Sequence, residues 1–164
     1  MQKRQFLTLA ASFAAGPALA VDPFKAASAA KTTPLILNLP SKQVQLSDAD
    51  LAALPQATLA NLTTPWYSTP QTFSGPTLRS IFEKYGISKT DQIRIVAHND
   101  YTVDLPASDA WTFNVIVATH NNGKRMSLKE KGPFFTMYPL DNPKASAQQY
   151  FSRCVWQGIS IDVK

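Results

Sequence analysis

The chain has 164 residues, and its 16 lysines and arginines outnumber its 11 aspartates and glutamates, which gives a formal net charge of +5 at pH 7. Because this charge is small and scattered, whereas nucleic-acid-binding proteins usually carry a concentrated basic face, we exclude nucleic acid as a partner. Hydrophobic residues make up 45% of the chain, as is normal for a globular protein.

The first twenty residues have the pattern of a secretory signal sequence. Lys3 and Arg4 form a charged start, residues 6–15 form an apolar run, and Ala18 to Ala20 offer a cleavage site. The run is far shorter than the roughly 20 residues that cross a bilayer. We expect a periplasmic protein cleaved near Ala20, which removes two basic residues and lowers the net charge from +5 to +3. Lys3 and Arg4 also resemble a twin-arginine export motif, so the export route stays open.

The roughly 140 residues that remain are enough for one domain. Residues 21–34, rich in alanine and lysine, predict a flexible leader, and residues 35–164 the folded domain. The only cysteine, Cys154, has no partner for an internal disulfide. Its apolar and aromatic neighbours predict a buried, inert thiol rather than a metal ligand or redox centre.

The first half of the domain contains three short strand signals and one helix start. Strands are predicted at residues 35–39, 44–46 and 57–62. Ser47, followed by two aspartates, predicts the start of a helix that Pro55 stops.

The next segment combines a proline-rich loop with the strongest helix signal in the chain. Residues 63–75 predict the loop. The helix is expected to open at Ser74, Gly75 and Pro76, since serine can cap and proline suits the first turn. Gly86 is expected to end it. Four apolar side chains fall on one helical face: Leu78, Ile81, Phe82 and Tyr85.

The second half is dominated by strand signals. Asn121, Asn122 and Gly123 form a strong hairpin signal, and residues 145–151 an amphipathic piece. This order predicts an α+β fold with a mixed, largely antiparallel sheet and two or three helices. The strands are expected at residues 92–97, 102–105, 115–119, 134–138 and 159–163.

A candidate ligand-binding turn joins two of these strands: His98, Asn99, Asp100 and Tyr101. Loop side chains at such a position can converge on a ligand. A carboxylate such as that of Asp100 can accept two adjacent N–H donors in bidentate fashion. Asn-Asp is also typical of a simple turn, and both interpretations stay open.

Aromatic and basic residues supply further candidates. Trp66, in the proline-rich loop, and Tyr138, at a strand end, offer flat faces on which a heterocycle can stack, although both types are also common in cores. Arg125 follows the hairpin. Together with its neighbours Lys124, Lys129 and Lys131 it predicts either a basic contact for a ligand or a solvated surface.

Other chemistries have little support in the sequence. The two histidines, His98 and His120, lack the spacing of zinc ligands, apart from the proximity of His98 to Asp100. The chain has no Gly-x-Ser-x-Gly elbow, no glycine-rich phosphate loop and no GxGxxG motif.

Five runs of the chain carry a resemblance to a known family: TTPWYSTPQTFSG (63–75), AHNDYTVDLP (97–106), NNGKRMSL (121–128), KGPFFTMYP (131–139) and RCVWQGISIDV (153–163). In this order they resemble the small periplasmic branch of the sulfite-oxidase-like, molybdopterin-binding oxidoreductase fold. In redox-active members a cysteine thiolate lying about where Thr63 falls binds molybdenum, and this chain has no cysteine there.

The resemblance implies a non-catalytic periplasmic protein that binds a reduced pterin, of the tetrahydropterin class, without a metal. Asp100 would accept the pterin's 2-amino group and ring N–H. Such proteins contact the sensor region of a membrane-bound cyclic-di-GMP enzyme, a diguanylate cyclase or phosphodiesterase. Two alternatives stay open: a molybdopterin-dependent oxidoreductase with a replacement ligand, and a partner-binding domain with a vestigial pocket. The expected ligand-binding residues are Trp66, His98, Asn99, Asp100, Tyr101, Arg125 and Tyr138.

Overall fold

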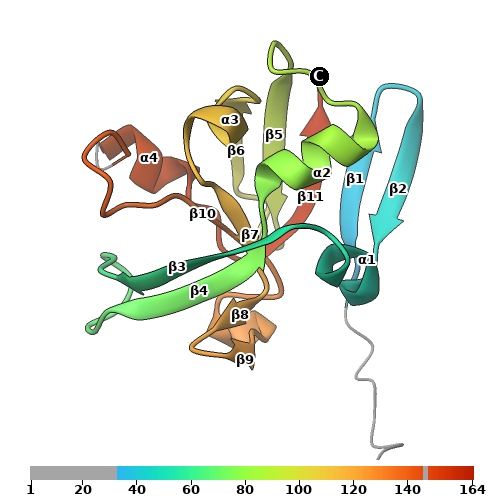
Figure 1. Ribbon diagram of the computed structural model, residues 1–164. Helices are drawn as coiled ribbons and strands as arrows, with labels where there is room; N and C mark the ends of the chain where they lie inside the picture. Colours follow the sequence, from blue (N-terminus) through green and yellow to red (C-terminus); the bar gives the residue numbers. More distant parts are fainter. Residues whose placement is uncertain (1–32, 146–147) are drawn as a thin grey trace, which may run out of the picture. The chain divides into compact units, whose positions relative to one another are not determined.

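The computed structural model describes residues 33–145 and 148–164 (Figure 1). The predicted signal sequence and the leader, apart from Thr33 and Pro34, lie outside these residues. No helix in the described part of the chain is long and apolar enough to cross a bilayer.

The fold is α+β, with mostly antiparallel sheets, as the sequence predicted. The first sheet has five strands in the order β2-β1-β11-β5-β6 (Figure 1). The pair β1–β11 is parallel, and the other pairs are antiparallel. The strands are β1 (Leu35–Leu39), β2 (Lys42–Leu46), β5 (Gln92–Ala97), β6 (Thr102–Pro106) and β11 (Gly158–Val163).

A four-stranded sheet, β3-β4-β8-β9, and a two-stranded sheet, β10-β7, make up the rest of the β-structure in the described residues. Single bridges link the sheets: Thr77 pairs with Ile116, and Phe134 with Gly158. All three sheets contribute fully buried side chains to one core. The strands are β3 (Gln56–Leu62), β4 (Gln71–Pro76), β7 (Ile116–Ala118), β8 (His120–Asn121), β9 (Lys124–Arg125) and β10 (Phe135–Met137).

Within residues 33–145 and 148–164, four short α-helices and one 3-10 turn connect the strands. Ser47 caps the first helix as predicted, in a capping box with Asp50. The third helix has one turn, carries no long apolar period and was not predicted. The elements are α1 (Asp48–Ala52), α2 (Leu78–Tyr85), α3 (Asp109–Thr112), η2 (Leu128–Glu130) and α4 (Gln148–Arg153).

The predicted opening of α2 at Ser74, Gly75 and Pro76 was wrong, because these residues belong to β4. Thr77 is the cap instead, and its side-chain oxygen accepts from the Ser80 N–H at 3.1 Å. Gly75 serves packing: a Cβ there would clash with the Val117 carbonyl oxygen, so glycine lets β4 lie against β7. Gly86 ends the helix as predicted, with φ 71°.

The loop predicted for residues 63–75 is shorter than expected. Leu62 pairs with Gln71, so residues 71–76 form β4 and the connection covers residues 63–70. The predicted hairpin is confirmed: Asn122 and Gly123 have φ values of 49° and 77° between β8 and β9.

A candidate ligand pocket lined by aromatic side chains

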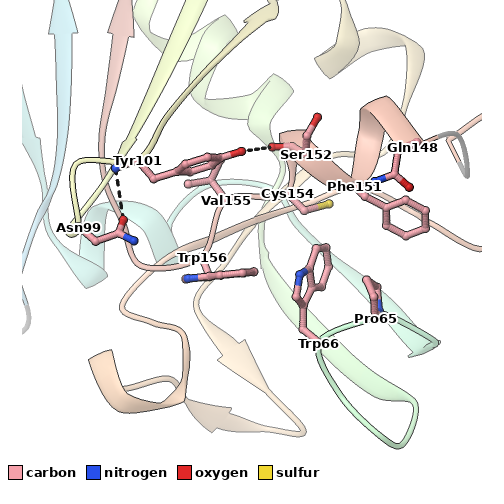
Figure 2. Close-up of a pocket in the computed structure, with 10 residues that line it drawn as sticks. All are labelled: Pro65, Trp66, Asn99, Tyr101, Gln148, Phe151, Ser152, Cys154, Val155 and Trp156. Atoms are coloured by element: carbon pink, nitrogen blue, oxygen red, sulfur yellow. Dashed lines mark hydrogen bonds between the residues drawn. The ribbon is translucent and has the colours of Figure 1, made fainter.

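A cavity of about 450 Å³ lies where three segments of the chain meet (Figure 2). We call it the aromatic cavity. Pro65 and Trp66 come from the β3–β4 connection, and Asn99 and Tyr101 from the β5–β6 turn. The remaining wall is formed by α4 and the residues after it: Gln148, Phe151, Ser152, Cys154, Val155 and Trp156.

Trp66 joins the aromatic cavity to the core. Its ring makes edge contacts with Phe135, Phe151 and Trp156, with centroids 5.5, 6.3 and 5.8 Å away. Phe135 is fully buried in β10. The Thr136 N–H donates to the Val155 carbonyl at 2.9 Å, which holds the Trp156 segment along this strand. The aromatic wall therefore rests on a buried strand of the core.

The β5–β6 turn directs two of the predicted residues into the aromatic cavity. Asp100 has φ 62°, a left-handed conformation that aspartate adopts more readily than most residues. The Asn99 side-chain oxygen accepts from the Tyr101 N–H at 3.3 Å. The Tyr101 hydroxyl donates across the cavity to the Ser152 carbonyl at 3.2 Å. Figure 2 shows the Tyr101 and Trp156 rings on opposite sides of the cavity.

His98 and Asp100 lie in the same turn but do not line the aromatic cavity, and both are exposed. The backbone N–H of His98 donates to the Gln157 carbonyl at 2.8 Å, which fastens the turn to the segment after Trp156. The Asp100 carboxylate is therefore not part of the cavity wall.

Cys154 is buried, as predicted, and burial raises the pKa of its thiol to about 12. Its sulfur lies in the wall of the aromatic cavity (Figure 2), which its position in the sequence did not indicate. Thr63 lies outside the residues that line it. Among residues 33–145 and 148–164, no three His, Cys, Asp or Glu side chains gather as metal ligands. Molybdenum ligation by this thiol would require the thiolate, which burial disfavours.

Arg125 is fully engaged in contacts within the protein. Its Nη2 lies 2.7 Å from one carboxylate oxygen of Asp48 and its Nε 3.1 Å from the other. Its Nη1 donates to three backbone carbonyls, those of Thr119, Met126 and Pro133. The structure does not bring this side chain to the aromatic cavity.

Tyr138 is also placed elsewhere. It is fully buried, and its hydroxyl donates to the Asp109 carboxylate at 2.7 Å. The same oxygen accepts from Nη1 of Arg153 at 2.6 Å. Burial, with the nearby Asp109 charge, raises the pKa of Tyr138 well above its usual range. Of the seven predicted residues, Trp66, Asn99 and Tyr101 line the aromatic cavity.

Sequence reasoning missed most of the wall contributed by the C-terminal segment. It interpreted Trp156 as a core residue and Phe151 as part of an amphipathic piece. Trp156 does pack on the core, but it also lines the cavity. The available signal was the run at residues 153–163, one of the five that resemble the sulfite-oxidase-like fold.

No protein-family model matches the chain, and no curated protein matches it significantly. The fold and the cavity therefore define the class of protein by themselves: an α+β protein with a preformed aromatic pocket of ligand size.

Proposed function

We propose that the protein is a non-catalytic periplasmic binding protein that holds a reduced pterin in the aromatic cavity. The observation that carries the proposal is the cavity's size and lining. Its volume of about 450 Å³ falls in the usual range for small-molecule pockets, and its walls combine two indoles, a phenol and a phenyl ring. Stacking a flat heterocycle on an aromatic ring contributes roughly 1–3 kcal/mol.

The edge of the ligand is the part that polar groups recognise. A pterin presents a 2-amino group and ring N–H as donors beside a ring carbonyl acceptor. The Asn99 amide lines the cavity and offers both a donor and an acceptor. The Asp100 carboxylate, next along the turn, offers a bidentate acceptor. We propose that the turn reads the pterin edge, with Asn99 as the nearer group.

The resemblance to the sulfite-oxidase-like fold supports the choice of a pterin. Three of the five resembling runs, widely separated in the chain, contribute residues to one cavity: Trp66 comes from the first, Asn99 from the second and Trp156 from the last. The resemblance also supports the partner that we propose, the periplasmic domain of a membrane-bound diguanylate cyclase or phosphodiesterase.

Calorimetry with purified mature protein and tetrahydroneopterin or tetrahydromonapterin, under anaerobic conditions, tests the proposal. We expect one site per chain. Trp66→Ala should weaken binding at least tenfold, because a stacking face is lost. Trp111→Ala is the matched control, since Trp111 packs on Phe82 with ring centroids 6.0 Å apart and does not line the cavity. Absence of binding, or equal effects of the two variants, contradicts the proposal.

Two further variants identify the side chain that hydrogen-bonds to the edge of the pterin ring. Asn99→Ala should weaken pterin binding at least tenfold, while Asp100→Ala should have the smaller effect, because Asn99 lines the cavity and Asp100 does not. The reverse order would assign recognition to the carboxylate. If both variants bind pterin as tightly as the unchanged protein, the turn is not part of the site.

One observation favours an alternative, a molybdopterin-dependent oxidoreductase, because the Cys154 sulfur lies in the cavity wall. Metal analysis of protein made in a molybdenum-replete host separates the two. We expect no stoichiometric molybdenum; its presence, with loss in Cys154→Ala, would replace the pterin proposal. Capture of the membrane partner without any pterin binding would instead indicate a vestigial pocket.

A further inference from the structure

The end strand of the four-stranded sheet borders a groove of about 540 Å³. In this sheet β3 pairs only with β4, so within the described residues its other edge has no neighbouring strand (Figure 1). Residues 58–60 of β3 form one wall of the groove. The rest comes from residues 112–114, at the end of α3 and just after it, and from residues 139 and 141–143, in the connection after β10. We call it the edge groove.

The backbone of β3 offers hydrogen-bonding groups to the edge groove. The Thr77 N–H donates to the Pro55 carbonyl at 3.0 Å, so the backbone groups of Pro55 and of every second residue through Leu59 point toward β4. The N–H and C=O of Thr58 and the N–H of Ala60 therefore point away from β4. Within the described residues, these three groups form no hydrogen bond.

The free edge of β3 lacks the charged side chains and prolines that usually prevent a strand from pairing with another chain. Residues 51–78 contain no Asp, Glu, Lys or Arg, and β3 contains no proline. The register shift in its pairing lies between Leu59 and Leu62, which leaves the first half of the strand regular. The side chains of Thr58 and Ala60 are small and exposed. An incoming strand therefore meets no charged or bulky barrier at this edge.

Asp141 is the one charged residue that lines the edge groove. Within the described residues, its carboxylate forms no ion pair. A segment that fills the groove can therefore place a cation against it. The β3 strand of a second copy would bring none, since residues 51–78 carry no charge. The charge of the groove thus favours a segment with a basic residue over a second copy of this strand.

We propose that the edge groove binds an extended segment of a partner protein, which adds to the sheet beside β3 and places a lysine or arginine against Asp141. Main-chain hydrogen bonds to Thr58 and Ala60 supply affinity, and alternate side chains of the segment supply specificity. The edge groove shares no lining residue with the aromatic cavity. The interaction therefore goes beyond the proposed ligand and does not depend on it.

Selection of random nonapeptides displayed on phage, with purified mature protein as the target, tests the proposal. We expect the enriched peptides to alternate β-branched residues with others, to lack proline in the paired stretch and to contain a lysine or arginine. Asp141→Asn should weaken binding of the synthetic form of the most enriched peptide at least fivefold at low salt and less at high salt. Enriched peptides without a basic residue, or equal binding to Asp141→Asn, would overturn the assignment.

Thr58→Pro and Thr58→Ala form a matched pair. Proline removes an N–H that points away from β4, so the sheet loses no hydrogen bond, whereas alanine keeps this N–H. We expect Thr58→Pro to weaken peptide binding at least tenfold and Thr58→Ala to weaken it less than threefold. Urea denaturation verifies that both variants fold. Equal binding by the two variants would contradict pairing with β3.

Hydrogen exchange followed by NMR tests the same pairing without a variant. The bound peptide should slow exchange of the Thr58 and Ala60 amide protons at least tenfold and leave those of β2, an edge strand of the first sheet, unchanged. Unchanged exchange at Thr58 and Ala60 would overturn the proposal, because the peptide would then bind elsewhere. A dimer in analytical ultracentrifugation that is lost in Thr58→Pro would also overturn it and would assign this edge to a second copy.

Discussion

The Asp109 carboxylate joins three elements through two hydrogen bonds. It lies at the start of α3 and accepts from Tyr138, just after β10, and from Arg153, at the end of α4. Asp109 is 6% exposed, so water does not replace these partners. Residue-scale effects on stability should concentrate here, because breaking a buried network leaves polar atoms unpaired.

We predict that Asp109→Ala lowers the free energy of unfolding by about 3 kcal/mol, since it leaves the Tyr138 hydroxyl and the Arg153 guanidinium without their acceptor. Urea denaturation measures the change. Asp109→Asn keeps one acceptor oxygen and should cost less. A loss below about 1 kcal/mol in Asp109→Ala would show that the network contributes little.

The buried Cys154 and Tyr138 predict sensitivity to alkali. Burial raises the pKa of the Cys154 thiol from 9.0 to about 12, and it also raises the pKa of the Tyr138 hydroxyl. A group whose pKa is raised by folding contributes stability that is complete below its pKa in the unfolded chain. This stability is lost as the pH rises toward its pKa in the folded protein. Stability should therefore fall above pH 9, by roughly 1.4 kcal/mol per pH unit for the thiol.

Denaturation curves recorded between pH 8 and 12 check this dependence. Cys154→Ala should flatten the curve most between pH 9 and 10, where the thiol is more fully ionised than the tyrosine in the unfolded chain because its ordinary pKa is 9.0 rather than 10.0. A slope that is unchanged in Cys154→Ala would assign the alkaline loss to other groups.

At the scale of elements, α2 shows how local structure is decided by packing. Ser74 and Thr77 are both suitable caps, but β4 takes Ser74 into the sheet, where its carbonyl accepts from the Thr119 N–H at 2.9 Å. We predict that Thr77→Ala costs about 1 kcal/mol in urea denaturation, as for loss of an N-cap. Ser74→Ala should cost less than half as much; equal costs would contradict the observed cap.

Much of the fold was readable from the sequence because it depends on local signals. Ser47, Gly86 and the Asn122-Gly123 turn act through their own backbone geometry, so short-range patterns identify them. The strand β4 was missed because its pairing with β3 and β8 is set by partners distant in sequence. Helix α3 was missed because one turn carries no period.

In the aromatic cavity, too, local features could be predicted and contacts between distant segments could not. Trp66 and the β5–β6 turn were predicted from the chemistry of single segments, and Asn99 and Tyr101 do line the cavity. The contribution of Trp156 depends on where β10 carries the chain, and the internal roles of Arg125 and Tyr138 depend on buried partners. The residues that were predicted depend on their own segment. The residues that were missed or misplaced depend on partners that are distant in sequence but close in space, which a single sequence does not encode directly.

For the described domain as a whole, the first sheet is completed by its last strand. β11 lies between β1 and β5, so the early β1–β2 hairpin joins the sheet only through it. The strand also follows directly from Trp156 and thus positions one wall of the aromatic cavity. Stability and ligand binding should therefore depend together on this strand.

We predict that deletion of residues 158–164 abolishes folding, because β1 and β5 lose their shared partner and Ile161 leaves the core. Far-UV circular dichroism and urea denaturation would show no cooperative transition. Lys164→Ala is the control, since it removes only the exposed contact between its ammonium and Asp104, and exposed ion pairs contribute little. A truncated chain that still unfolds cooperatively would show that β1 and β5 are held without β11.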